Sequence, residues 1–195
     1  TEPSNVDYAS YQATDITSGN SLEVARFTIR DGGASADADS ASTTLDAIAF
    51  TVANSASLRR VALYDGSTEI AEVAGGATLT YSGLSGLVAA DGGTKDLSLR
   101  ATFVASVTDN QQFSFTVNSA TANSGGSTFA AADAGAAASS TTSDRNRVEV
   151  TASKLVFTSV PASANIDTDF TASVAARDAN ENLDLDSTAS VAITK

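Results

Sequence analysis

Three aspartates in one short loop are the first candidates for chemistry in this chain. They are Asp31, Asp37 and Asp39, in a stretch of small and polar residues that begins with an Asp-Gly-Gly tripeptide. Carboxylates held near one another repel unless a hard cation such as Ca²⁺ neutralises them, and calcium takes oxygen ligands. The loop therefore predicts a calcium site, and the alternative is an acidic loop surrounded by water.

A second series places an oxygen-bearing side chain at every other position further along the chain. The series is Asp178, Asn180, Asn182, Asp184 and Asp186. The spacing resembles the start of an EF-hand calcium loop, but Leu183 stands where that loop needs glycine and Ala189 where it needs a bidentate glutamate. The series thus favours a polar hairpin turn, with a cation site between domains, formed by Asp178 to Asp184, as the alternative.

The residue types that most enzymes use near neutral pH are missing. The chain has no histidine, cysteine, methionine or tryptophan, which excludes thiol nucleophiles, imidazole bases, disulfides and thioether ligands. A glycosidase-like pair of carboxylates would need an aromatic-lined cleft, and the lysines (Lys95, Lys154 and Lys195) lie in no catalytic motif. We expect no enzyme activity, no catalytic residues and no cofactor other than calcium.

The chain is strongly acidic. It has 23 acidic and 11 basic side chains among 195 residues, a formal net charge of −12, and 17 of the acids are aspartates. An anionic surface repels phosphate backbones and acidic lipid headgroups. No run of apolar residues approaches the roughly 20 that a membrane-spanning helix needs. We predict no binding to nucleic acid and no insertion into a membrane.

Residues 96–117 have the clearest strand pattern. Apolar side chains alternate with polar ones at Leu97, Leu99, Ala101 and Phe103, and the alternation resumes at Phe113, Phe115 and Val117. A period of two is typical of a strand with one buried face. Because Thr108-Asp109-Asn110 lies between the two runs, the pattern predicts an antiparallel hairpin with three phenylalanines on its buried face.

Similar patterns predict further strands before and after this hairpin. Residues 21–30 and 43–54 alternate in the same way, and Asp65-Gly66 between two alternating runs is a strong hairpin signal. Residues 118–143 are rich in alanine, serine and glycine and predict a long surface loop with at most one short strand. We interpret residues 1–150 as one antiparallel β-sandwich domain of the all-β class.

The sequence changes character after residue 150. Three further strands are predicted at residues 154–160, 169–178 and 187–195, with Pro161 at the edge of the first. An Ig-like sandwich of roughly 100 residues has about seven strands. Residues 151–195 are therefore interpreted as the opening strands of a second, partial Ig-like unit.

Three segments resemble tandem Ig-like repeats of very large secreted or cell-surface proteins of Bacteroidota. These segments are residues 10–40, 143–160 and 174–193. The last is similar to the DANGN-D-D turn of bacterial Ig-like repeats, with Glu181 where glycine is usual. The resemblance implies a secreted or cell-surface location and a structural or adhesive role, and it supplies no catalytic residues.

Taken together, these features predict a structural or adhesive repeat of an extracellular stalk, fibre or filament, stiffened by calcium. Its partners would be neighbouring repeats or copies of itself. The simplest explanation of the partial second unit is that this chain is part of a longer one, and the sharper hypothesis is that residues 155–195 leave open edges that a strand of another copy completes. The alternative is a module that binds surface glycans or proteins. That module would need an exposed aromatic platform, for which Tyr8, Tyr11, Tyr64 and Tyr81 are the tyrosines available.

Overall fold

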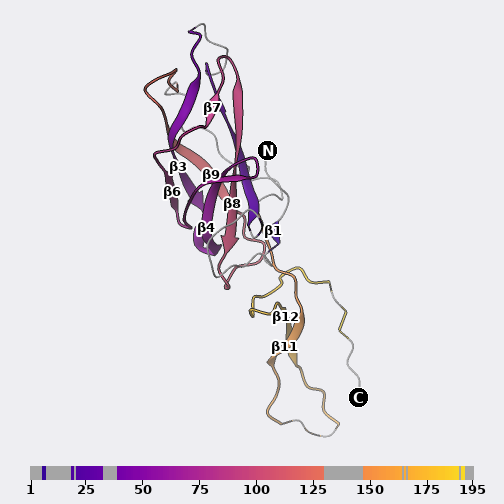
Figure 1. Ribbon diagram of the computed structural model, residues 1–195. Coiled ribbons are helices and arrows are strands. Elements are labelled where there is room, and N and C mark those ends of the chain that lie inside the picture. The colour runs from indigo at the N-terminus through magenta and orange to yellow at the C-terminus, as the bar shows by residue number, and fades with distance from the viewer. Residues whose placement is uncertain are drawn as a thin grey trace.

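The chain folds almost entirely into antiparallel β-sheets (Figure 1), as the alternating sequence predicts. The computed structural model describes residues 6–7, 19, 21–32, 39–129, 147–163, 165, 167–188 and 190–191. Its strands are β1 (Val6–Asp7), β2 (Leu22–Arg30), β3 (Thr43–Ala53), β4 (Leu58–Asp65), β5 (Thr68–Ala74), β6 (Thr78–Tyr81), β7 (Val88–Ala89), β8 (Thr94–Phe103), β9 (Ser114–Ala122), β10 (Val148–Glu149), β11 (Lys154–Ser159) and β12 (Ser173–Arg177). A short 3-10 helix, η2 (Ser55–Ser57), precedes β4.

The first sheet has the strand order β2-β8-β4-β5, and all its neighbours run antiparallel. Strands β4 and β5 form the predicted hairpin about Asp65-Gly66, where Gly66 has a φ of 58°. That left-handed conformation suits glycine, which has no Cβ to clash with the backbone. Strand β8 lies between β2 and β4 in the sheet, and its alternating apolar residues Leu97, Leu99, Ala101 and Phe103 are buried.

The second sheet is built around β3. Strand β3 pairs with β9 along most of its length and with β6 and β7 along separate parts. The predicted inward residues Ile48, Phe50 and Val52 are all buried. This sheet packs face to face on the first, which confirms the antiparallel sandwich predicted from the period-two pattern.

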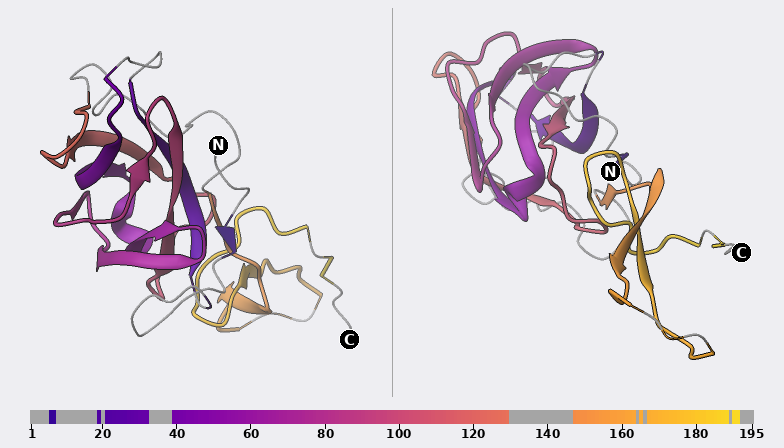
Figure 2. Two further views of the ribbon diagram at one scale, coloured as in Figure 1. Left: turned by 45° about the horizontal axis from the view of Figure 1, so that its top comes forward. Right: turned by 90° about the horizontal axis from the view of Figure 1, so that it is seen from below.

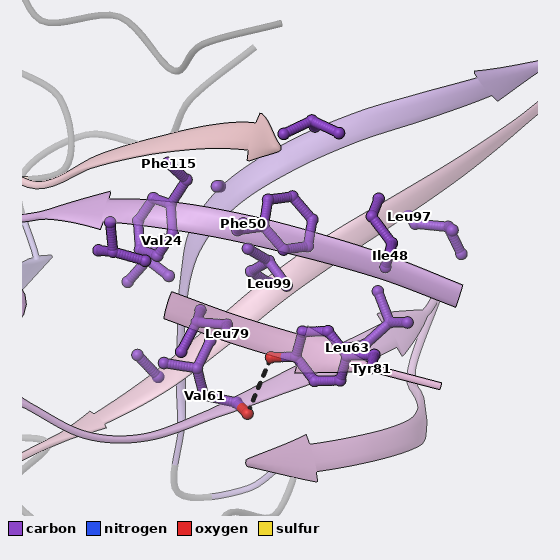
Figure 3. Packing of buried hydrophobic residues seen from close by; sticks show 14 of the residues in the cluster. Val24, Ile48, Phe50, Val61, Leu63, Leu79, Tyr81, Leu97, Leu99 and Phe115 are labelled. Atoms are coloured by element: carbon purple, nitrogen blue, oxygen red, sulfur yellow. Dashed lines mark hydrogen bonds between the residues drawn. The ribbon is translucent and has the colours of Figure 1, made fainter. Parts of the chain in front are cut away.

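The core lies between the two sheets (Figure 3). Phe50 of β3 contacts Phe27 of β2 edge to face, with ring centroids 5.3 Å apart, and Tyr81 of β6 with centroids 6.3 Å apart. The Tyr81 hydroxyl crosses the core and donates to the carbonyl of Val61 at 3.0 Å. The Phe27–Phe50 pair and the hydrogen bond of Tyr81 therefore join the two sheets, whereas the Phe50–Tyr81 pair lies within the second sheet.

One predicted hairpin is wrong. Strands β8 and β9 do not pair with each other, because β8 pairs with β2 and β4 whereas β9 pairs with β3 in the opposite sheet. The connection between them crosses from one sheet to the other, so Phe103 and Phe113 stack across the core with ring centroids 5.9 Å apart. The inward residues were predicted correctly, but their strand partners were not.

The predicted loop over residues 118–143 is partly wrong as well. Strand β9 continues to Ala122, because its residues stay hydrogen-bonded to β3 as far as Leu45. Residues 130–143 lie outside the described part of the chain.

Strands β11 and β12 form a separate two-stranded antiparallel sheet, here called the C-terminal hairpin (Figure 2). It lies beyond one end of the sandwich, close to the short parallel pair formed by β1 and β10. Of the predicted third strand, residues 187, 188, 190 and 191 are described and lie in no strand. In the described ranges of the chain, no helix is long and apolar enough to cross a membrane.

Candidate functional site

Two loops meet where the C-terminal hairpin joins the sandwich. One is the crossover between β8 and β9, residues 104–113, and the other is the segment 178–186 that follows β12. We call this contact the junction. Asn182 donates its side-chain amide to the carbonyl of Ala105 at 2.9 Å and accepts the backbone N–H of Val107, also at 2.9 Å. Asn182 itself is only 6% exposed.

Asp109 lies at the centre of the junction and is 4% exposed. Its Oδ1 accepts the backbone N–H of Val150 at 2.8 Å, and its Oδ2 accepts that of Leu185 at 2.7 Å. Asn110, with a φ of 61° that asparagine tolerates, donates its own N–H to the carbonyl of Val148 at 2.9 Å. A buried carboxylate is tolerated when charge-assisted hydrogen bonds replace its lost hydration. Asp109 therefore joins the crossover to the segment before β11, at Val150, and to the segment after β12, at Leu185.

The turn after β12 is ordered by its own side chains. Oδ1 of Asp178 accepts the backbone N–H groups of Asn180 and Asn182, at 2.9 and 2.8 Å, and Oδ2 accepts the side-chain amide of Asn182 at 2.9 Å. Short polar side chains that bond to a nearby backbone in this way favour turns over strands. A polar turn therefore forms and presents Asn182 to the sandwich. The predicted hairpin does not form, because residues 187, 188, 190 and 191 after it lie in no strand.

Three carboxylates converge on the junction. Asp109, Asp184 and Asp186 each offer an oxygen, and these oxygens all lie within 4.8 Å of one another. Oδ2 of Asp184 accepts the N–H of Ala152 at 2.9 Å, and Oδ2 of Asp186 accepts the side-chain amide of Asn110 at 3.2 Å. Oδ1 of Asp184 is buried and has no hydrogen-bond partner. The arrangement offers only oxygen ligands, which suits a hard cation.

The first predicted calcium loop has a different arrangement. Both oxygens of Asp31 accept hydrogen bonds, from the hydroxyl of Thr43 at 2.5 Å and the N–H of Gly92 at 2.8 Å, and Asp31 is fully buried. Asp39 accepts the N–H of Ala41 and the hydroxyl of Ser127. These carboxylates hold loops together. Asp37, the third predicted ligand, lies outside the described residues.

The second predicted set is divided by the structure. Asp178 and Asn182 serve the turn, Asn180 contributes its backbone N–H to that turn, and Asp184 joins the three-carboxylate cluster. Asp186 belongs to the same alternating series in the sequence, whereas Asp109 was interpreted only as part of a hairpin turn. The role of Asp109 depends on contacts with Val150 and Leu185, far along the chain, and a local sequence pattern does not predict such contacts.

Two of the four tyrosines that an aromatic platform could use are buried. Tyr64 is fully buried, donates its hydroxyl to Glu69 at 2.8 Å and lies under the guanidinium of Arg100. Tyr81 belongs to the core. Neither can stack on a glycan as the alternative reading requires, and Tyr8 and Tyr11 lie outside the described residues.

The outer side of β2 and β8 carries a polar hollow of about 540 Å³. Its charged and hydroxyl groups bond to one another, since Arg26 pairs with Glu23 at 2.5 Å and the hydroxyl of Thr28 donates to Asp96 at 2.6 Å. Phe27 also lines the hollow, and its phenyl ring packs edge to face on Phe50 in the core. We see no group here that is positioned for catalysis.

Comparison of the chain with models of protein families, with curated proteins and with solved structures gives no significant match.

Proposed function

We propose that this chain is a structural, non-catalytic module of an extracellular stalk, fibre or filament, in which strands from a neighbouring copy complete the C-terminal hairpin. One observation carries the proposal. The hairpin is fastened to the sandwich by partly buried hydrogen bonds, yet its own large apolar side chains are exposed.

The exposed side chains lie on one face of the hairpin, here called the apolar face. Leu155 and Phe157 lie opposite Ala176 and Val174, so these four residues point to the same side. Leu155, Phe157 and Val174 are 48%, 67% and 42% exposed. Burying a large apolar side chain stabilises a protein by about 1.5–3 kcal/mol, and a lone two-stranded sheet is marginally stable in water. A covering partner would supply the missing stability.

The backbone of the hairpin is equally incomplete. Strands β11 and β12 pair as strands only with each other among the described residues, which leaves the outer edge of β11 open. The outer edge of β12 is partly covered, because Leu183 bridges Arg177 and Asp184 donates its N–H to the carbonyl of Ala176. An open edge accepts a strand from another chain, whose backbone completes the ladder while its side chains cover the apolar face. Every copy carries the same edges. Copies linked in this way form either a closed pair or an open filament.

The extracellular and adhesive parts of the proposal rest on the resemblance to Ig-like repeats. In this proposal the partners of the chain are neighbouring repeats or copies of itself. The acidic surface of the chain disfavours nucleic acid and anionic membranes as partners. The sandwich then acts as the rigid spacer of the fibre. Units stacked end to end contact only their neighbours, and antiparallel ladders in each unit resist pulling.

Association through the apolar face is tested by multi-angle light scattering of the purified chain over a range of concentrations. The native chain is expected to show a mass that rises above that of the monomer with concentration. Phe157→Asp places a charge in the apolar face and is expected to keep the chain monomeric, because an unpaired charge cannot be buried cheaply.

Thr158→Asp is the matched control, since it adds the same charge at an exposed neighbour on the same strand. This variant should associate like the native chain. A native chain that stays strictly monomeric at the highest concentration would overturn the proposal, and so would equal loss of association in both variants.

A further inference from the structure

We propose that two copies of the chain join edge to edge through β11, whose open edges pair antiparallel about a two-fold axis at Val156. The inference rests on the association of copies proposed above and deepens it, because it names the edge, the register and the number of copies. The product is a closed pair with one continuous four-stranded sheet, in the strand order β12-β11-β11-β12.

The outer edge of β12 is already in use. Leu183 bridges Arg177 in the antiparallel sense. The N–H of Asp184 donates to the carbonyl of Ala176 at 3.1 Å. The chain therefore covers this part of β12 with the segment that follows the polar turn, and an incoming strand finds its open ladder along β11.

The bond to Ala176 also shows which backbone groups of β11 point outward. In an antiparallel ladder, pairs that exchange hydrogen bonds alternate with pairs whose N–H and C=O groups point away from each other. Because the carbonyl of Ala176 points to the outer edge of β12, Ala176 and its partner Leu155 form a pair of the second kind. Phe157, two positions further on and paired with Val174, repeats this arrangement. The N–H and C=O groups of Leu155 and Phe157 therefore face the open edge of β11.

These backbone groups determine where the two-fold axis lies. With the axis at Val156, Leu155 of one copy lies opposite Phe157 of the other, and the outward N–H and C=O groups of both residues find partners across the axis. An axis at Leu155 would place Phe157 opposite Ser153, whose N–H already donates to a carbonyl of β12 at 2.8 Å. An axis at Phe157 would place Leu155 opposite Ser159, beyond the register shift that follows Phe157.

The apolar face matches itself in this register. Leu155 and Phe157, which are 48% and 67% exposed, become cross-strand neighbours on the face that they share with Val174 and Ala176. Each large side chain gains an apolar neighbour across the axis, which removes part of its surface from water. The backbone ladder and the side chains thus favour the same alignment.

The charges of the hairpin allow two copies to meet at this edge. The formal net charge of −12 opposes contact between copies, but β11 and β12 contain no acidic residue. The one charged side chain of β11, Lys154, forms an ion pair with Glu181 of its own chain. In the proposed register Lys154 falls opposite Thr158 of the other copy, so no like charges of the two β11 strands face each other directly.

Single cysteines test the pairing, because the chain has no cysteine of its own. With the axis at Val156, the two Val156 residues form a pair that does not exchange hydrogen bonds, with Cα atoms about 4.5 Å apart. A disulfide needs a Cα separation of about 4.4–6.8 Å. Val156→Cys, oxidised by oxidised glutathione at an associating concentration, is expected to give a covalent dimer on a non-reducing gel, and a reductant should remove it.

Two matched variants separate the register from the edge. Thr158→Cys lies on the same strand, but its two copies are four residues, or about 13 Å, apart along the ladder. Ala175→Cys lies directly opposite Val156 on β12, away from the axis. Both variants should give at least about tenfold less covalent dimer than Val156→Cys, because residues more than about 7 Å apart cannot be bridged.

Light scattering of the native chain separates this inference from the proposed association. Its mass is expected to level off at twice that of the monomer. If the native chain associates but Val156→Cys cross-links no better than Thr158→Cys or Ala175→Cys, or if the mass rises beyond a dimer, the closed pair through β11 is overturned and association stands. A native chain that stays monomeric at every concentration overturns both.

Discussion

Asp109 shows how a single side chain can organise the contact between two units. It is nearly inaccessible to solvent, and its two oxygens accept backbone N–H groups from segments on either side of the boundary between the sandwich and the hairpin. An amide would offer only one acceptor oxygen, and a longer carboxylate would not fit the same two donors. The requirement is thus for aspartate itself.

Glu181 is a second residue whose type matters. It stands where the resembled repeats have glycine, and its φ of 71° lies in the left-handed region. The left-handed conformation costs a residue with a Cβ roughly 1–2 kcal/mol. The exposed ion pair between Glu181 and Lys154 offsets little of that cost. We predict that Glu181→Gly raises the free energy of unfolding of the hairpin by about 0.5–1 kcal/mol, measured by urea denaturation.

Glu181→Ala separates the two contributions. It removes the carboxylate but keeps a Cβ in the left-handed conformation, so it should be neutral or slightly destabilising. If alanine stabilises as much as glycine, backbone strain is not the cause of the effect.

At the scale of elements, period-two alternation specifies which side chains point inward but not which strands pair. Leu97, Leu99, Phe103, Phe113 and Phe115 are buried as predicted. Their strands nevertheless lie in opposite sheets, because the connection from Val104 to Gln112 is long enough to cross the sandwich edge. The hairpin about Asp65-Gly66 was predictable for the opposite reason, since a tight turn brings the two strands that it joins side by side.

The candidate site was only partly predictable for a related reason. The alternation that contains Asp184 and Asp186 is visible in the sequence, and it correctly marks a polar turn. Asp109 enters the cluster through the fold of the crossover, which depends on contacts with Val150 and Leu185. Long-range contacts of this kind leave no local pattern.

Two buried tyrosines, Tyr81 in the core and Tyr64 outside it, give a prediction about alkaline pH. Burial, together with the nearby negative charge of Glu72, raises the pKa of Tyr81 above its usual 10. Burial and the hydrogen bond to Glu69 raise the pKa of Tyr64 to about 12. Because these pKa values are higher in the folded than in the unfolded state, the tyrosines contribute their full share of the free energy of unfolding below pH 10. That share is lost as the pH rises through the folded pKa. The Tm should therefore fall steeply between about pH 10 and pH 12.

Ultraviolet absorbance of the tyrosinate ion checks this directly. Two of the four tyrosines should ionise only together with the loss of the circular dichroism signal. Tyr81→Phe leaves the carbonyl of Val61 without its donor and should lower the stability at neutral pH by about 1–2 kcal/mol. Ionisation of all four tyrosines near pH 10 in a chain that is still folded would contradict the burial described.

At the scale of the whole molecule, the chain consists of two unequal parts. The sandwich has a continuous core between its two sheets, whereas the hairpin exposes the apolar residues that would form a core of its own. Two hydrogen bonds hold the parts together: Asp109 accepts the backbone N–H of Leu185, and Asn182 donates to the carbonyl of Ala105. If copies associate as proposed, the sandwich is the rigid part and the hairpin is the part that a neighbouring copy covers.

Hydrogen–deuterium exchange of the hairpin at low and high protein concentration tests this account most directly. If strands of a neighbouring copy complete the hairpin, the backbone amides of β11 and β12 should become protected as concentration rises, while those of the central strand β8 are protected throughout. Phe157→Asp should remove the concentration dependence. Hairpin amides that exchange at one rate at every concentration would contradict the central claim.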